Sequence, residues 1–254
     1  MSSQYLFEEF DGEVTKILEV QLDRLTSYKD FQSEALAGAA LAAASASKVR
    51  TGALKLICQR CLDLKLSEFS PHSLTKLSWA LALAEHRDAQ LMSEIAEEIS
   101  LRSWDFEAEE LAKCLCAFAE LRLRHEAMLM AVALQLTWRI DALSAESLKR
   151  VAVAMGQLRF AKQPFFDALA SRMTLHPQRS MEQLTAVLWA FAATETQSAV
   201  LCERVALEAM ASEPSEEHHV RLLKAFERLS FVARGVACPL FHQSLSGAES
   251  ICKP

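Results

Sequence analysis

The stretch Leu74-Thr-Lys-Leu-Ser-Trp-Ala80 recurs further along the chain as Leu184-Thr-Ala-Val-Leu-Trp-Ala190. Both copies have a Leu, an apolar residue three positions on and an Ala six positions on. The other copies begin at Leu36, Leu111, Leu148 and His219, so successive copies start 38, 37, 37, 36 and 35 residues apart. All six copies keep the Ala, at positions 42, 80, 117, 154, 190 and 225. A period of this length indicates a repeat protein.

Each copy has the periodicity of a helix with one apolar face. In the second copy the apolar residues are Leu74, Leu77, Ala80, Leu81 and Ala84, which is the spacing of one helical face. The recurring Ala predicts a close helix contact, because a small side chain lets neighbouring axes approach to about 8–10 Å. Most copies also carry a Ser four residues before the first position, which predicts an N-cap, at Ser70, Ser144, Ser180 and Ser215.

A second amphipathic segment follows each copy after a short polar turn. We expect second helices at 88–99, 126–139 and 197–210, and a partial one at 13–25. The last copy is weaker, because His219 replaces the first Leu and Pro239 interrupts the segment that follows. Each repeat is therefore predicted to be a helical hairpin.

Stacked hairpins of this kind predict an all-α fold, a right-handed α-solenoid of about six helix-turn-helix repeats of 35–38 residues. We expect one solenoid over residues 1–254. Within it, 1–29 is a partial repeat or cap, 30–213 holds five core hairpins, and 214–254 is a degenerate last repeat with a tail.

Composition fits a large helical core, since the chain is 51% hydrophobic and has only six Gly and six Pro. No apolar run is long enough to predict a membrane span, and the acidic N-terminus resembles neither a signal nor a transit peptide. Seven cysteines in mostly apolar helical stretches indicate buried thiols in a reducing compartment. Cys58 and Cys61 form a CxxC, but no second CxxC or paired His lies at zinc spacing, so we predict no metal site and no cofactor.

The pattern Ser-x-x-x-Leu-x-x-hydrophobic-x-Trp-Ala-hydrophobic-Ala resembles the octotricopeptide and heptatricopeptide repeats of FAST-kinase-like and RAP-domain proteins. Residues 70–84 and 180–192 match best, and the resemblance covers residues 30–245. It implies an α-solenoid that binds RNA in mitochondria or plastids, in RNA processing, stability, translation or ribosome assembly. The chain departs from the family in having no recognisable RAP domain and no visible transit peptide.

Cations recur two positions after the start of most copies and would form a row along the first helices. Together with neighbouring positions they make up a predicted single-stranded RNA surface of Lys76, Lys113, Arg150, Arg221, Lys224, Arg228, Trp79 and Gln157. A row of acidic residues lies four positions earlier, at the spacing of intrahelical ion pairs, so the cations equally fit ordinary surface pairing: Glu109–Lys113, Glu146–Arg150 and Glu217–Arg221. Trp79 and Trp189 fit interhelical packing at least as well as base stacking.

Nothing in the sequence indicates catalysis, since it has no Gly-rich phosphate loop, nucleophile elbow or zinc-protease motif. The net charge of −6 requires any RNA contact to be confined to one face. We therefore expect a non-catalytic RNA-binding repeat protein, with no DNA or membrane partner, in a mitochondrion or plastid. Two alternatives stay open: a protein-binding scaffold or structural subunit of the same shape, and a cytoplasmic location.

Overall fold

The computed structural model describes residues 32–45, 51–175, 180–212 and 216–229, and in these ranges the protein is helical without a strand. The predicted all-α class is confirmed for them. The expected segments 13–25 and Pro239 lie outside the described residues. Contacts divide the chain into two units, Met1–Gln135 and Leu136–Pro254.

The six copies of the repeated pattern each form a helix, and the first five of these helices begin a described hairpin. In chain order these helices are α2 (Gln32–Ser45), α4 (Pro71–Leu83), α6 (Ala108–Glu120), α8 (Ala145–Gln157), α10 (Met181–Thr194) and α12 (Glu216–Arg228). The expected second helices also form, as α3 (Thr51–Asp63), α5 (Ala89–Arg102), α7 (Glu126–Trp138), α9 (Gln163–Leu175) and α11 (Ala199–Ser212). Two short 3-10 helices, η2 (Leu66–Glu68) and η3 (Ile140–Ala142), connect hairpins.

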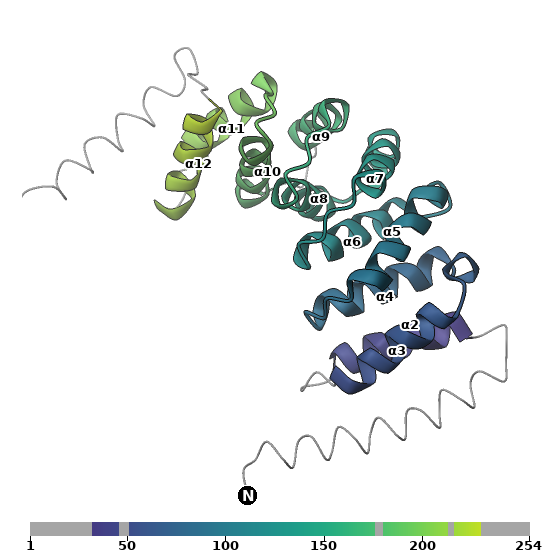
Figure 1. Cartoon of the computed structure of the whole chain (residues 1–254). Coiled ribbons are helices and arrows are strands. Elements are labelled where there is room, and N and C mark those ends of the chain that lie inside the picture. Colours follow the sequence, from purple (N-terminus) through teal and green to yellow (C-terminus); the bar gives the residue numbers. More distant parts are fainter. Residues whose placement is uncertain (1–31, 46–50, 176–179, 213–215, 230–254) are drawn as a thin grey trace, which may run out of the picture. The chain divides into compact units, whose positions relative to one another are not determined.

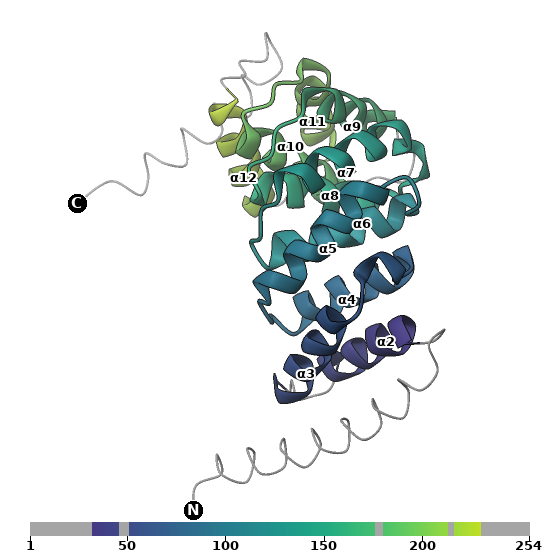
Figure 2. The same cartoon turned by 45° about the vertical axis from the view of Figure 1, so that its right-hand side comes forward.

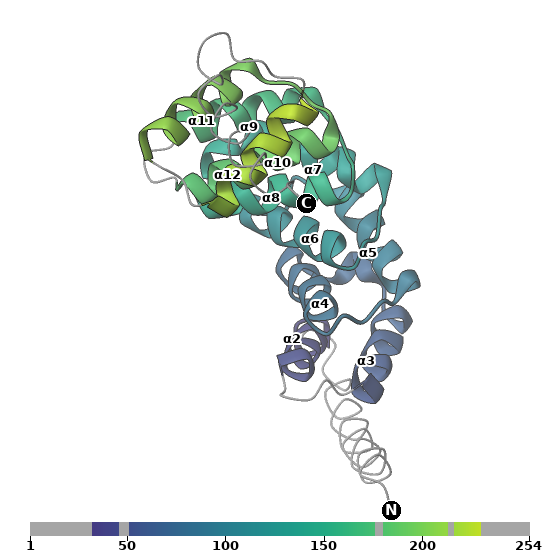
Figure 3. The same cartoon turned by 90° about the vertical axis from the view of Figure 1, so that its left-hand side faces the viewer.

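In the N-terminal unit the first helices pack side by side, α2 on α4 and α4 on α6 (Figure 1). The second helices α3 and α5 contact each other and form another layer beside them (Figure 3). The C-terminal unit repeats the arrangement, with α10 packed between α8 and α12 and with α9 against α11 (Figure 2). Stacking of all the hairpins into one right-handed array stays a prediction.

Serine caps begin the first helices where the sequence predicts them. The Oγ atoms of Ser70, Ser144 and Ser180 each accept a hydrogen bond from the backbone N–H three residues on, at 3.1 to 3.2 Å. Gln183 Oε1 also accepts from the Ser180 N–H at 2.9 Å, which completes the expected capping box. The cap at Ser215 lies outside the described residues.

The recurring Ala is buried in five of the six copies, at Ala80, Ala117, Ala154, Ala190 and Ala225. Between α8 and α10 the fit is tight: a Cβ on Gly156 would lie 3.2 Å from the Ala190 Cα and 2.9 Å from the Trp189 ring. Small residues on both helices therefore permit this close approach.

Ala42 departs from the expectation, because its side chain is exposed. In α10 the equivalent Ala190 faces the preceding first helix, α8. No helix precedes α2 among the described residues, so the corresponding face of α2 has no such neighbour there. The other face of α2 is buried as in the later copies: Ala40, Ala43 and Ala44 lie four, seven and eight positions after Leu36, and the equivalent positions are buried in α4, α6, α8 and α10.

Candidate nucleic-acid interface

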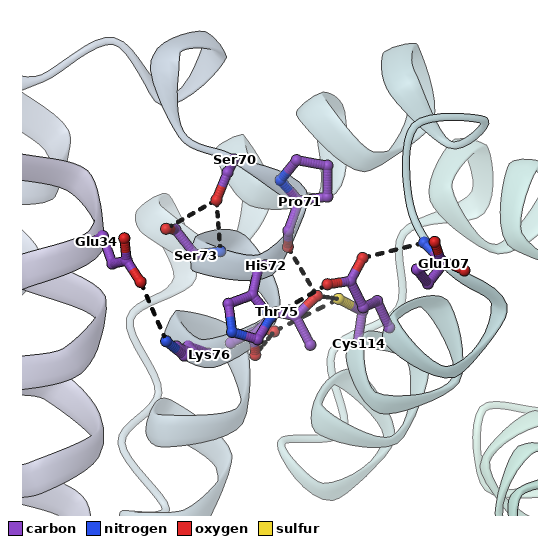
Figure 4. Close-up of polar contacts among 11 residues, drawn as sticks. Glu34, Ser70, Pro71, His72, Ser73, Thr75, Lys76, Glu107 and Cys114 are labelled. Carbon is purple, nitrogen blue, oxygen red and sulfur yellow. Dashed lines mark hydrogen bonds and ion pairs between the residues drawn. The ribbon is translucent and has the colours of Figure 1, made fainter. Parts of the chain in front are cut away.

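The N-terminal ends of neighbouring first helices are joined by polar contacts in the N-terminal unit. Lys76 Nζ of α4 lies 3.7 Å from Glu34 Oε1 of α2, and His72 Nδ1 lies 3.2 Å from Glu110 Oε1 of α6 (Figure 4). Beneath them the buried Thr75 hydroxyl lies 3.4 Å from the Cys114 Sγ. The acidic row therefore pairs across helices as well as along them.

Glu146 is the centre of a similar network in the C-terminal unit. Its carboxylate lies 2.9 Å from Lys149 Nζ and 3.1 Å from Arg150 Nε, and it accepts a 3.3 Å hydrogen bond from Gln183 of α10. Burial raises the pKa of Glu146, but the hydrogen bonds from Lys149, Gln183 and Arg150 outweigh it and hold the pKa below its ordinary value. Lys149 also reaches Glu182 of α10 at 3.8 Å.

These contacts involve two of the predicted RNA-binding cations. Lys76 and Arg150 each have a carboxylate partner. Of the three intrahelical pairs expected from the sequence, Glu146–Arg150 is confirmed. Lys113 is exposed on α6, and Gln157 is exposed at the end of α8. The intrahelical partner expected for Arg221, Glu217, has a side chain outside the described residues.

The remaining predicted cations come together. Arg221, Lys224 and Arg228 follow one face of α12 at intervals of three and four residues, and all three line an open pocket of about 580 Å³. The opposite face of α12 buries Leu222, Phe226 and other apolar residues. We call this pocket the α10–α12 groove; its walls are Val153, Glu182, Thr185, Ala186, Trp189, Ala192, Ala193, Arg221, Lys224, Ala225 and Arg228.

Trp189 lies in the α10–α12 groove with 43% of its surface exposed. One edge of its ring rests over Gly156 of α8, where only a glycine leaves room for it. The indole is thus held by packing while part of its surface faces the groove. Packing and an exposed stacking surface, which the sequence presented as alternatives, are combined in this one side chain.

Trp79 occupies the equivalent position in the N-terminal unit and lines a second, more polar pocket of about 650 Å³. Its neighbours there include the cations Arg87 and Arg122 and the carboxylates Glu85 and Glu120. Arg87 Nε also donates a 2.7 Å hydrogen bond to the Leu121 carbonyl at the end of α6. Among the described residues the charges around Trp79 are therefore balanced, whereas the charged residues that line the α10–α12 groove are three cations and Glu182.

Several residues of these pockets were missed by the sequence interpretation. Trp189 was left out of the predicted RNA surface because packing was preferred to base stacking, and Arg87 and Arg122 were not considered. A signal existed for Arg122, because it lies eleven residues after the start of its copy, as do Glu85, Arg159 and Glu195. All four have a positive φ of 49° to 57°.

The described cysteines are free thiols, and Cys58, Cys61, Cys114 and Cys202 are buried, as expected from their apolar surroundings. Burial raises the pKa of Cys202 to about 12 and that of Cys114 to about 11. Cys116 is half-buried. Thiols with such raised pKa values are largely protonated near neutral pH and are poor nucleophiles in this state.

Comparison with protein-family models and with curated proteins found no match to this chain. In the described part of the chain, no helix has both the length and the apolar character needed to cross a membrane.

Proposed function

We propose that this protein is a non-catalytic α-solenoid that binds single-stranded RNA. The α10–α12 groove is the observation that carries the proposal. It offers three cations on one helix face, spaced for successive phosphates, beside a partly exposed indole that can stack on a base. The recurrence of hairpins with side-by-side first helices supports the solenoid.

The local charge of this groove matters because the whole chain is acidic. With a net charge of −6 the bulk field repels a polyanion, so affinity has to arise where cations outnumber carboxylates. Lys76 and Arg150 have the carboxylate partners Glu34 and Glu146, whereas Arg221, Lys224 and Arg228 share one pocket with the exposed indole of Trp189. We place the principal contact on α12, and Lys76, Lys113, Arg150 and Gln157 remain predicted secondary contacts.

A salt-dependent titration tests the proposal. Binding of a mixed-sequence single-stranded RNA to the whole chain should weaken with salt, each neutralised phosphate contributing about 0.7 to the slope of log K against log salt. Replacing Arg221, Lys224 and Arg228 with Gln should lower that slope by about 2 and weaken binding. Trp189→Ala should weaken binding by about 1–3 kcal/mol without changing the slope.

The matched control removes the same charge elsewhere. Lys55, Lys65 and Arg204 are exposed and lie outside the groove, so replacing these three with Gln should leave the slope unchanged. Equal losses in the two triple variants, or binding that does not respond to salt, would contradict the proposal.

The proposed setting is an organelle, a mitochondrion or a plastid, where the resemblance to octotricopeptide and heptatricopeptide repeats suggests roles in RNA processing, stability, translation or ribosome assembly. Fluorescence microscopy of the full-length protein in its own cells tests this location. A diffuse cytoplasmic signal would remove the organellar part of the proposal and leave RNA binding untouched.

A second candidate function, a protein-binding scaffold, is favoured by one feature of α7. Met130, Leu134 and Trp138 lie four residues apart on one face of this helix and are 44%, 54% and 81% exposed. Exposed apolar side chains in a contiguous stripe often mark a protein interface. A partner helix with its own apolar stripe would suit this face.

Affinity purification from native extract with two baits distinguishes this candidate. Replacing Leu134 and Trp138 with Gln leaves the α10–α12 groove intact, so RNA binding should persist in this double variant. A protein retained by the unmodified bait and lost with the double variant favours the scaffold. Identical sets of retained proteins count against it.

A further inference from the structure

Three potential metal ligands from separate parts of the N-terminal unit meet between the first two hairpins. Cys58 lies on α3, His86 in the turn after α4, and Asp88 at the N-cap of α5. One ligand atom from each side chain lies within 4.8 Å of the other two. Cys58 is 1% exposed, whereas His86 and Asp88 are half-buried, so the cluster opens to solvent on one side.

The other hairpins serve as an internal comparison. Twenty-two residues after the start of its copy each second helix has a buried small residue: Cys58 in the first copy, then Ala96, Ala133, Ala170 and Ala206. In four of the five second helices, Ala is therefore sufficient for packing at this position. A thiol in its place is an addition that packing does not require.

His86 is a similar departure. It lies just after the left-handed residue that ends the first helix, where the later copies have Leu123, Phe160 and Thr196. An apolar residue is usual at this place in such a helix end. His86 thus places an imidazole at a position that is mainly apolar in the later copies. It does so in the second copy, and the second helix just before that copy, α3, has Cys58 where the other second helices have Ala.

Asp88 already has one structural task, since its Oδ1 accepts a 3.0 Å hydrogen bond from the Leu91 N–H as the N-cap of α5. A carboxylate has a second oxygen, so the cap leaves an acceptor for another partner. The hydrogen bond also fixes the orientation of the side chain. A ligand held by a second contact in this way is typical of metal sites.

We propose that Cys58, His86 and Asp88 form a binding site for a zinc-type divalent cation. Thiolate, imidazole and carboxylate are all ligands of Zn²⁺, at about 2.0–2.3 Å from the metal. In a tetrahedral site such ligand atoms lie about 3.3–3.8 Å apart, so small side-chain rotations close the cluster around an ion. A water molecule from the open side supplies the fourth ligand.

Charge balance supports this choice of ion. The thiol gives its proton to solvent as the bond from Cys58 Sγ to the metal forms. The resulting thiolate and the Asp88 carboxylate carry two negative charges beside a neutral imidazole, which neutralises a divalent cation in a site that is buried on its α3 side. The site fastens α3 of the first hairpin to the turn of the second, whatever the solenoid binds.

Metal titration of the purified whole chain under reducing conditions tests the site, with Co²⁺ as the spectroscopic probe. We expect one equivalent of Co²⁺ to give a thiolate-to-cobalt charge-transfer band, which Zn²⁺ then removes by displacement. Cys58→Ala should abolish the band. His86→Leu and Asp88→Ser should each weaken Zn²⁺ binding at least tenfold, an effect of about 1.4 kcal/mol or more.

The substitutions are chosen from the other repeats, so each places a residue that this fold already accommodates at the same position. Cys202→Ala, which removes a buried thiol from α11, is the control and should keep the band. Zn²⁺ should also raise the Tm of the unmodified chain and leave that of Cys58→Ala unchanged. Absence of the band, or a band that survives Cys58→Ala, overturns the proposal; neither result bears on RNA binding.

Discussion

At the residue scale, the size of one side chain sets how closely neighbouring first helices approach. Ala190 of α10 lies against Gly156 of α8, and a single added methyl group on Gly156 would come within 3.2 Å of backbone. Five of the six recurring Ala residues are buried, which is what such a contact requires. The sixth, Ala42, is exposed and provides a natural control.

The first prediction uses this control. Ala117→Leu should lower the free energy of unfolding by about 1–3 kcal/mol, because the larger side chain overpacks a buried helix contact. Ala42→Leu makes the same chemical change at an exposed site and should alter stability by less than about 0.5 kcal/mol. Chemical denaturation measures both. Similar losses of unfolding free energy in the two variants would show that the helix contact does not explain the recurring Ala.

A second prediction concerns Glu146, whose pKa is held below its ordinary value of 4.5. A lowered folded-state pKa means that the carboxylate stabilises the fold above its unfolded-state pKa and that this contribution is lost as pH falls through the folded-state value. Glu146→Gln should therefore destabilise the protein at pH 7 and have no effect well below the folded-state pKa. Glu97→Gln, on the exposed face of α5, is the control for loss of a charge.

At the scale of the element, each described turn from first to second helix has one geometry. The first helices α4, α6, α8 and α10 are each followed by a residue of positive φ: Glu85, Arg122, Arg159 and Glu195. The next residue donates its N–H to the carbonyl five positions back, as His86 does to Leu81 at 2.9 Å. This is the usual left-handed termination of a helix, made here with charged residues where Gly is favoured.

The energetic cost of a left-handed backbone conformation at a non-glycine residue gives a third prediction. Arg122→Gly should raise the free energy of unfolding by about 0.5–1 kcal/mol, because the left-handed conformation costs a non-glycine residue about 1–2 kcal/mol and costs glycine little. The same substitution at Arg150, in the middle of α8, should instead lower stability by about 1 kcal/mol. Thermal denaturation should show that the two substitutions change stability in opposite directions. A loss of stability in both variants would contradict the left-handed assignment at Arg122.

Helices and caps could be predicted from the sequence because their signals are local. The apolar periodicity starting at Leu74, the Ser180–Gln183 capping box and the polar turns are all visible within a few residues. The left-handed turn escaped prediction because it is built from Glu and Arg, without the Gly that usually announces it. The exposure of Ala42 in α2 escaped prediction because burial at this position depends on which helix lies next to it.

The candidate sites could be predicted less well, since they depend on contacts between helices. The basic residues of α12 were identified from spacing, but the carboxylates that compensate Lys76 and Arg150 sit partly on other helices, as Glu34 does. Cys58 was discounted because ligands were sought along the chain, whereas His86 and Asp88 come from the next hairpin. Repetition of the hairpin is what allows such distant residues to be compared.

At the scale of the whole molecule, the main contacts join each helix to helices close to it in the chain. Stability in such a protein is nearly a sum of terms for single repeats and for neighbouring pairs. A local defect should therefore have a local effect. This behaviour would distinguish a repeat array from a globule with one shared core.

A fourth prediction follows for hydrogen exchange. Gly156→Ala should speed amide exchange in α8 and α10, where the added Cβ meets Trp189 and Ala190, and should leave α2 and α4 protected as before. Mass spectrometry of exchanged peptides reports the four helices separately. Uniform acceleration across the chain would contradict additivity between repeats.

The turn within each hairpin also has a consequence for how such a chain can change in length. From the start of a copy to the residue before its second helix there are always fourteen positions, ending at Asp88, His125, Lys162 and Ser198. The variation in spacing from 38 down to 35 residues therefore falls in the second helices, which have 13 or 14 residues, and in the connections that follow them. We expect insertions and deletions to be tolerated in those connections, so a gene for this protein could gain or lose a codon there while each hairpin stays intact.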